Sequence, residues 1–180
     1  MKDTEIEKIK QCIEQKSLCA INRDMIDELT TYCFPLALSD RLVLLANVYD
    51  FSIDGYKIMR TQDITEVFCD DAEEFNEMII RKEGVLDDFN PKIIDVKNLK
   101  NVFDYFLKSG QSIIVQCEGY DESLFYVGKI GAVLKNEIEL KTFDGCGVWD
   151  KKSTKIAYNK ITCVSYGSRY VTVLSKYLSQ

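Results

Sequence analysis

The segment EIEKIKQCIEQKSLCAI (residues 5–21) has a pattern that returns later in the chain as LKNVFDYFLKSGQSIIV (residues 99–115). In each segment, apolar residues spaced three and four apart give way to a short, continuous apolar run. The two segments align at an offset of 94, which places Ile9 opposite Phe103. Such spacing predicts an amphipathic helix, and the apolar run after it predicts a strand. We therefore predict that a helix leading into a strand occurs twice.

The repeat continues through two further pairs of segments. RLVLLANVYD (41–50) and NEIELKTFD (136–144) are both strand-like apolar runs, and their final aspartates keep the offset of 94. DITEV (63–67) and KITCV (160–164) correspond at an offset of 97, which adds three residues to a loop of the second copy. Short apolar segments bounded by polar turns are typical of strands, so each copy is predicted to be rich in β-structure.

These matches predict two tandem units, residues 1–80 and residues 95–180, each a helix followed by four or five short strands. Residues 81–94 are the predicted linker, because they carry the turn-forming residues Gly84 and Pro91. Short, evenly spaced strands in so small a unit favour a strongly bent sheet that closes into a barrel. The predicted fold class is mainly β with flanking helices (α+β), as two tandem small SH3-like or Sm-like barrels, each preceded by a helix. A single α+β domain is the alternative.

Two stretches also carry a resemblance to known proteins. They are DGYKIMRTQDITEV (54–67) and the segment from VGKIGAVL to VLSKYL (127–178). Their most specific features are the I-T-x-V step, present in both, and the terminal SRY…LSKYL pattern. In these features the chain resembles a bacterial family of uncharacterised proteins with two small barrels, over most of its length. That family carries no assigned activity, so the resemblance implies a fold and no reaction.

The composition predicts a folded, cytoplasmic protein. A chain of 180 residues with 46% hydrophobic content can bury a core. No apolar run approaches the length of about 18 residues that a membrane helix needs, and the first residues are charged, so we expect no membrane partner. The seven cysteines are an odd number with no CxxC pair, which indicates thiols in a reducing compartment.

The absence of histidine narrows the possible chemistry. Without histidine the chain has no Ser-His-Asp or Cys-His catalysis and no HExxH zinc site. No segment matches GxGxxG or a Walker loop, so no nucleotide cofactor is expected. Cys146 is the thiol expected on a loop, and it has no histidine to activate it. We predict a protein that is not an enzyme and needs no cofactor, with a carboxylate-dependent hydrolase as the last alternative.

One segment has the beginning of a calcium-binding loop. DFSIDG (50–55) places oxygen-bearing side chains at positions one, three and five of an EF-hand loop and glycine at position six. The twelfth position, where a bidentate Glu is needed, is Thr61, and the flanking residues are strand-like rather than helical. We predict instead a hairpin turn at Asp54 and Gly55, and no metal site.

Charge is distributed unevenly along the chain, whose net charge is −6. Residues 1–90 hold 10 Lys and Arg against 20 Asp and Glu, a balance of −10. Residues 91–180 hold 13 against 9, a balance of +4. The possible acidic partner surface consists of Asp70, Asp71, Glu73 and Glu74. The possible partner-binding or RNA-binding face consists of Lys151, Lys152, Lys155, Lys160 and Arg169. The acidic run also has a purely structural explanation, because carboxylates are favourable near a helix N-terminus.

Three kinds of binding function fit this charge pattern. We favour a protein-interaction or regulatory adaptor whose acidic and basic units pair within or between chains, so that a homo-oligomer is also possible. The main alternative is an Sm-like RNA-binding protein that uses the basic second unit. Such a surface needs exposed aromatics among its cations, and the candidates are Trp149, Tyr158, Tyr166 and Tyr170. The acidic chain as a whole opposes phosphate binding at long range. A further alternative is an acidic inhibitor or immunity-type partner of a basic protein.

Overall fold

The computed structural model describes residues 3–119 and 123–178, and within them all ten strands form a single antiparallel sheet. The strands are β1 (Cys19–Asn22), β2 (Thr31–Leu38), β3 (Leu42–Tyr49), β4 (Ser52–Arg60), β5 (Glu66–Phe68), β6 (Ile113–Cys117), β7 (Leu124–Val133), β8 (Glu137–Thr142), β9 (Thr154–Ala157) and β10 (Cys163–Tyr166). The helices are α1 (Asp3–Gln15), α2 (Asp71–Lys82), α3 (Leu99–Ser109) and α4 (Arg169–Leu174), with 3₁₀ turns η1 (Thr61–Asp63), η2 (Tyr158–Lys160) and η3 (Ser175–Tyr177). The prediction of a mainly β protein with flanking helices is confirmed.

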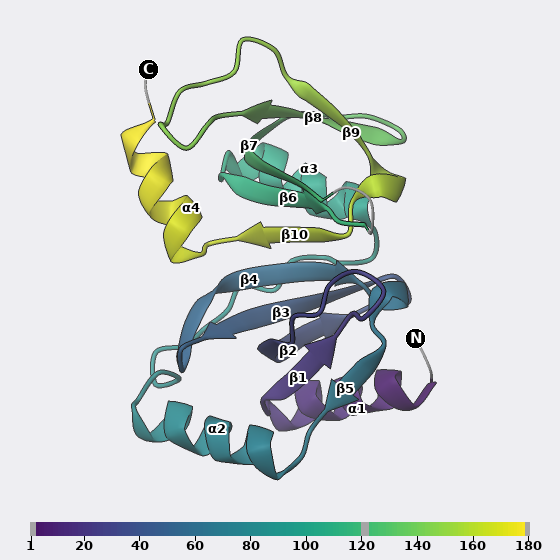
Figure 1. Ribbon diagram of the computed structural model, residues 1–180, viewed down its shortest axis with the longest axis vertical. Helices are drawn as coiled ribbons and strands as arrows, with labels where there is room; N and C mark the ends of the chain where they lie inside the picture. The colour runs from purple at the N-terminus through teal and green to yellow at the C-terminus, as the bar shows by residue number, and fades with distance from the viewer. Residues whose placement is uncertain (1–2, 120–122, 179–180) are drawn as a thin grey trace.

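The strand order contains the same arrangement twice. The order is β5-β1-β2-β3-β4-β10-β6-β7-β8-β9, and the last five strands repeat the order of the first five. We call α1, β1 to β5 and α2 the first unit, and α3, β6 to β10 and α4 the second unit. Figure 1 shows β4 and β10 side by side where the two units meet. The sheet is open, and its two edges are β5 and β9.

The repeat also holds in the details of pairing. Val67 of β5 lies opposite a residue of β1, and Val164 of β10 lies opposite the equivalent residue of β6, at the offset of 97 expected from DITEV and KITCV. Register shifts occur at matching places, between Pro35 and Ala37 in β2 and between Ile130 and Ala132 in β7. Bulges of this kind bend a sheet and increase its twist. Each unit is therefore bent at the equivalent place in its own strands.

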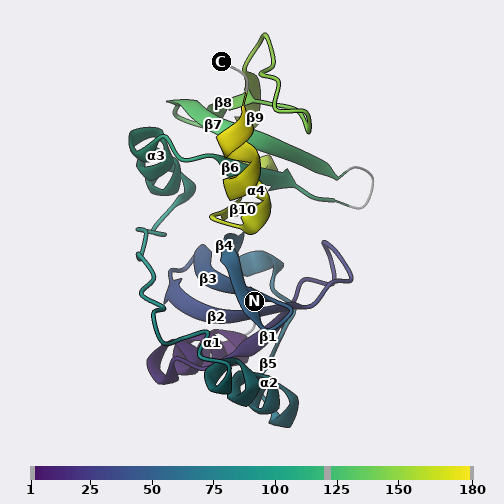
Figure 2. The same ribbon diagram turned by 90° about the vertical axis from the view of Figure 1, so that its left-hand side faces the viewer.

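One of the four hydrophobic clusters spans both units. Leu42, Leu44 and Ile58 of the first unit belong to the same buried cluster as Phe103 and Phe106 of α3. In Figure 2, α3 lies beside the strands of the second unit, while α1 and α2 lie at the end of the first unit that faces away from the second. Because apolar surface of both units is removed from water in one cluster, neither unit can be separated without exposing part of the core.

The predicted linker is built into this core. Helix α2 continues to Lys82, two residues beyond the predicted end of the first unit. Ile94 is 3% exposed and Val96 is 5% exposed, both in the cluster that spans the units. The Ser39 hydroxyl donates a hydrogen bond of 2.8 Å to the Val96 carbonyl oxygen. The end of the linker and the two residues after it therefore contact the first unit.

The predicted turn at Asp54 and Gly55 is wrong. The β3–β4 turn is formed by Asp50 and Phe51, which have φ values of 46° and 59° and are flanked by the paired residues Tyr49 and Ser52. Two central residues with positive φ match the right-handed twist of a hairpin. Gly55, with φ of 73°, lies inside β4 where the register shifts against β3. Its conformation serves a bulge rather than the turn.

Among the described residues, no helix has the length and apolar character needed to span a membrane.

Candidate binding site at the junction of the two units

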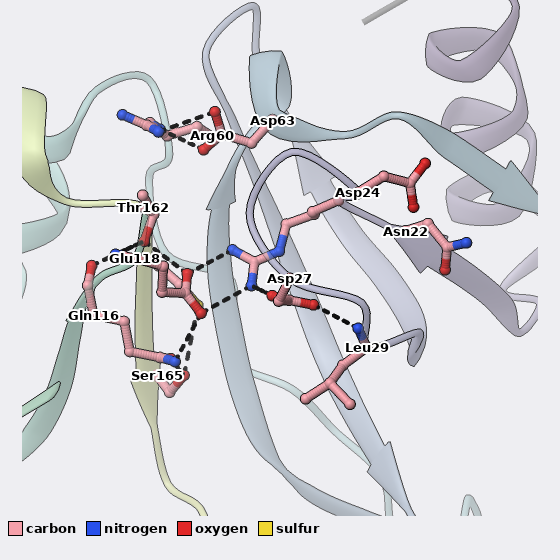
Figure 3. A network of polar contacts seen from close by, with 12 residues as sticks. Asn22, Asp24, Asp27, Leu29, Arg60, Asp63, Gln116, Glu118, Thr162 and Ser165 are labelled. Carbon is pink, nitrogen blue, oxygen red and sulfur yellow. Dashed lines mark hydrogen bonds and ion pairs between the residues drawn. The ribbon is translucent and has the colours of Figure 1, made fainter. Parts of the chain in front are cut away.

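A buried arginine links the two units. Arg23, which follows β1, is 5% exposed. Its Nη1 donates to Oε2 of Glu118 at 2.9 Å, and its Nη2 donates to Oε1 of the same carboxylate at 3.1 Å. Nη2 also pairs with Asp27. Glu118 follows β6, so this two-point ion pair joins equivalent ends of β1 and β6 across the junction (Figure 3).

The carboxylate of Glu118 is further satisfied by its own unit. The Thr162 hydroxyl donates to Oε2 at 2.7 Å, and Nε2 of Gln116 donates to Oε1 at 3.1 Å. Burial by itself would lower the pKa of Arg23, but the hydrogen bonds and negative charges of Glu118 and Asp27 raise it. A buried ion pair with its remaining bonds filled is a rigid contact. The network therefore holds the ends of β1 and β6 against each other.

Arg60 connects the 3₁₀ turns η1 and η2 through an ion pair within the first unit and a hydrogen bond to the second unit. Nε and Nη2 of Arg60 donate to the two carboxylate oxygens of Asp63 at 2.5 and 3.0 Å. Nη1 of Arg60 donates to the carbonyl oxygen of Asn159 at 3.3 Å. Asp63 lies in η1 and Asn159 in η2, so this arginine fixes the equivalent turns of the two units next to each other. Figure 3 shows Arg60 and Asp63 above the Glu118 network.

Both turns border a cavity of about 590 Å³, which we call the junction pocket. Its lining comes from both units and consists of Asp40, Arg41, Leu42, Arg60, Thr61, Gln62, Asn98, Leu99, Lys100, Lys135, Tyr158 and Asn159. Four of these residues are cations and one is a carboxylate. In a chain with net charge −6, the junction pocket is therefore a local concentration of positive charge.

Local hydrogen bonds explain why these side chains meet. The Ser39 hydroxyl accepts a bond of 3.0 Å from the Leu42 backbone N–H, which closes the β2–β3 turn that carries Arg41. The Tyr158 hydroxyl donates to the Leu134 carbonyl oxygen at 2.9 Å, which holds the β7–β8 turn that carries Lys135. These two turns are equivalent in the repeat. The head-to-tail arrangement of the units brings both to one pocket.

The predicted basic residues do not line the junction pocket. Lys151 and Lys152 are exposed in the β8–β9 connection. Lys155 lies on β9, 3.7 Å from a carboxylate oxygen of Glu137 and 3.5 Å from one of Glu139. Lys160 precedes β10 and Arg169 follows it, so these two cations lie at opposite ends of one strand. The structure brings Lys151 and Lys152 together and separates Lys160 from Arg169.

The predicted acidic residues mainly form the start of α2. Oδ1 of Asp70 accepts a bond of 3.1 Å from the Ala72 N–H, and Oε2 of Glu73 accepts one of 3.2 Å from the Asp70 N–H. Glu73 is buried, and this burial raises the pKa of its carboxyl group. Asp71 and Glu74 are exposed. Two of the four carboxylates thus form a capping box, as the helix explanation requires.

Replacing Asp70 with alanine is expected to lower the free energy of unfolding by about 1 kcal/mol, because the backbone N–H groups at the start of α2 lose their acceptor. Urea unfolding followed by circular dichroism measures this loss. Asp71→Ala is the control, since this neighbouring carboxylate is exposed and accepts no capping bond. Equal stability of the two variants would contradict the structural role of Asp70.

Most of the aromatic residues predicted for base stacking pack against other aromatic rings of the chain. The ring of Trp149 packs edge-on against Phe143, under the ammonium group of Lys141 at 4.8 Å. Tyr166 is buried and stacks on Tyr56, while Tyr158 stacks on Phe103. Tyr170 is the exposed one, at 53%. These four aromatics do not form one stacking surface.

The cysteines include a close pair that the sequence did not reveal. The Sγ atoms of Cys12 in α1 and Cys69 after β5 lie 3.2 Å apart, and Cys69 is exposed. Cys146 is exposed in the loop after β8, as predicted. Among the described residues, no group of three or more Cys, Asp and Glu side chains is arranged to hold a metal ion.

The sequence also did not indicate that Arg23 pairs with Glu118, or that Arg41 and Lys135 line one pocket. Each of them stands alone in a turn, and neither a charge run nor a motif marks it. Only the alignment of the β2–β3 and β7–β8 turns within the repeat could have paired Arg41 with the region of Lys135. No protein family, curated protein or solved structure matches the chain.

Proposed function

We propose that the protein is a non-catalytic adaptor of the cytoplasm that binds an acidic segment of a partner protein in the junction pocket. The observation that carries this proposal is the lining of the pocket, which contains four cations, Arg41, Arg60, Lys100 and Lys135, and one carboxylate, Asp40. Carboxylate side chains of a partner are the natural complement of such a surface. The seven free thiols, four of them buried, support a reducing compartment.

Two of the four cations are available for a ligand. Arg60 is engaged with Asp63, and Lys100 donates to Asp104 at 2.6 Å. Arg41 and Lys135 have no ion-pair partner among residues 3–119 and 123–178, and both are exposed. Binding an acidic segment therefore breaks no existing ion pair of these two residues.

As part of the same proposal, each unit is a small SH3-like or Sm-like barrel that stays open between its first and last strands in the sheet order. The repeated order of five strands and the matching bulges in β2 and β7 support this. In the first unit, β4 pairs with β10 and β5 stays at the sheet edge. In the second unit, β10 pairs with β4 and β9 stays at the sheet edge. Such small β-units commonly serve as binding modules, although the fold alone assigns no function.

RNA is the second candidate ligand, and one observation favours it. The junction pocket places the ring of Tyr158 and the amides of Gln62 and Asn159 among its cations. An aromatic ring, hydrogen-bonding amides and positive charge together suit a nucleotide. We rank RNA second because Trp149 and Tyr166 pack against other rings, the exposed Tyr170 does not line the pocket, and the chain is acidic.

The test measures binding of fluorescein-labelled hexaglutamate and of labelled oligouridylate by fluorescence anisotropy. We expect the peptide to bind, and Arg41→Ala/Lys135→Ala to weaken it about tenfold, since two exposed ion pairs of about 0.7 kcal/mol each amount to about 1.4 kcal/mol. Lys151→Ala/Lys152→Ala is the matched control. It also removes two exposed cations, but outside the junction pocket.

Three other outcomes would contradict the binding of an acidic partner segment in the junction pocket. If oligouridylate binds more tightly than the peptide and is weakened by Arg41→Ala/Lys135→Ala, the ligand is RNA and the adaptor proposal fails. If neither probe binds at low salt, the junction pocket is not an anion site. If Lys151→Ala/Lys152→Ala weakens binding more than the pocket variant does, the basic face predicted from the sequence is the site.

A further inference from the structure

The last strands of the two units in chain order, β5 and β10, differ in their strand pairing. Val67 in β5 and Val164 in β10 are equivalent in the repeat. On its outer side, Val164 lies opposite Ile58 of β4, so a strand of the first unit completes β10. Strand β5 has no second strand beside it, because it is an edge of the sheet.

Two side chains of α1 occupy the place of that missing strand. Oε2 of Glu5 accepts a bond of 2.6 Å from the Val67 backbone N–H. Nζ of Lys8 donates a bond of 2.7 Å to the Val67 carbonyl oxygen. Glu5 is 7% exposed and lies 3.3 Å from Lys8, so the two side chains form a compact clasp. Unpaired edge strands invite pairing with another chain, and the clasp satisfies the groups that would do so.

The opposite edge of the sheet has no such clasp. Strand β9 pairs with β8 alone. The Tyr158 N–H donates to the Asn136 carbonyl oxygen, so the alternation of an antiparallel ladder turns the N–H and C=O of Lys155 away from β8. Among the described residues, none bonds to these two groups of Lys155. In the repeat, Lys155 is the equivalent of Ile58, which pairs with β10 inside the chain.

We propose that β9 of one copy pairs with β5 of a second copy when Glu5 and Lys8 release Val67. The contact would repeat the β4–β10 joint and place Lys155 opposite Val67. Charge favours this occupant over a β9–β9 contact, which would bring the basic residues Lys151, Lys152 and Lys155 of two copies together. The β5 side instead offers Glu66, Asp70 and Asp71. A head-to-tail contact of this type forms a closed ring or an extending chain of copies.

The clasp is tested by removing it. Glu5→Ala/Lys8→Ala keeps good helix formers in α1 and frees Val67. Sedimentation velocity should then show a shift from the monomer mass of 20.7 kDa to at least twice that mass as concentration rises. Glu7→Ala/Lys10→Ala is the matched control, since it removes a Glu and a Lys with the same spacing from the exposed side of α1. We expect this control to remain monomeric.

A second pair of variants tests the other edge. Added to Glu5→Ala/Lys8→Ala, Lys155→Pro removes the outward N–H without removing a bond to β8, and it should abolish the association. Lys155→Thr loses the same charge but keeps the N–H, and it should retain association. The proposal is overturned if the folded clasp variant stays monomeric, if the Glu7→Ala/Lys10→Ala control associates equally, or if Lys155→Pro and Lys155→Thr behave alike.

A third measurement does not depend on the stability of any variant. A synthetic peptide of residues 61–68 (TQDITEVF) carries the β5 strand, and it is titrated into the unaltered, ¹⁵N-labelled protein. We expect shifts of the Lys155 and Ala157 amide signals that are lost when the peptide is N-methylated at Val67. If these signals do not move, or move equally with the methylated peptide, β9 does not accept β5 and the proposal falls.

Discussion

Gly55→Ala is expected to lower the free energy of unfolding by about 4 kcal/mol, because it combines a strained backbone with a clash inside the sheet. Gly55 has φ of 73°, a conformation that residues with a side chain rarely adopt. A Cβ atom there would lie 2.5 Å from the Tyr166 carbonyl oxygen and 2.7 Å from the Gly167 carbonyl carbon, and closer still to the Ser168 nitrogen. All three are backbone atoms, so no side-chain rotation can relieve the contact.

Urea unfolding of Gly55→Ala and Gly145→Ala measures this effect against a matched change. Gly145 is exposed, and a Cβ added there would meet nothing within 4 Å. We expect Gly145→Ala to change stability by no more than about 0.5 kcal/mol. If the two variants were equally stable, the close backbone contact between β4 and the end of β10 would be refuted.

Arg23→Met is expected to cost about 3 to 5 kcal/mol, because it leaves the carboxylate of Glu118 buried without its cation. Methionine preserves most of the apolar volume of the arginine stem, so the loss reports the charge rather than a cavity. The measurement is again the free energy of unfolding. Arg81→Met is the control, since Arg81 pairs with Glu77 at 2.7 Å but is about half exposed. Exposed pairs contribute about 1 kcal/mol at most.

The double variant Arg23→Met/Glu118→Met shows how much of the lost stability comes from the unpaired carboxylate of Glu118. Removing both charges leaves no unpaired carboxylate at Glu118, so we expect most of the stability lost in Arg23→Met to return. Asp27 is partly exposed and can be hydrated when Arg23 is absent. A cost of Arg23→Met no greater than that of Arg81→Met would show that the junction does not depend on this pair.

The repeat was predictable because its signals are local. Helical spacing around Ile9 and Phe103, and the apolar runs that follow, depend on residues near each other in the chain. The 97-residue offset of DITEV and KITCV correctly located the equivalent strands β5 and β10. These patterns suffice to indicate two similar units.

The junction was not predictable, because its causes are not local. Gly55 was assigned to a turn on its dipeptide with Asp54, whereas its conformation is required by a bulge and by backbone more than 100 residues later. Likewise, the basic face was chosen from runs of lysine, whereas the junction pocket gathers single cations such as Arg41 and Lys135 from equivalent turns. Only the head-to-tail arrangement brings these residues together.

The β4–β10 joint also determines the order in which the chain can be completed during synthesis. Residues 163–166 of β10 pair with residues 56–59 of β4, so β4 stays unpaired on that side until β10 has been synthesised. Until then, a newly made first unit presents an unpaired backbone and the apolar side chains of Leu42, Leu44 and Ile58 to the surrounding solution. Contacts so distant along the chain are slow to form, and an uncovered strand edge is prone to aggregation in the meantime. A first unit without β10 is therefore expected to aggregate more readily than the full chain.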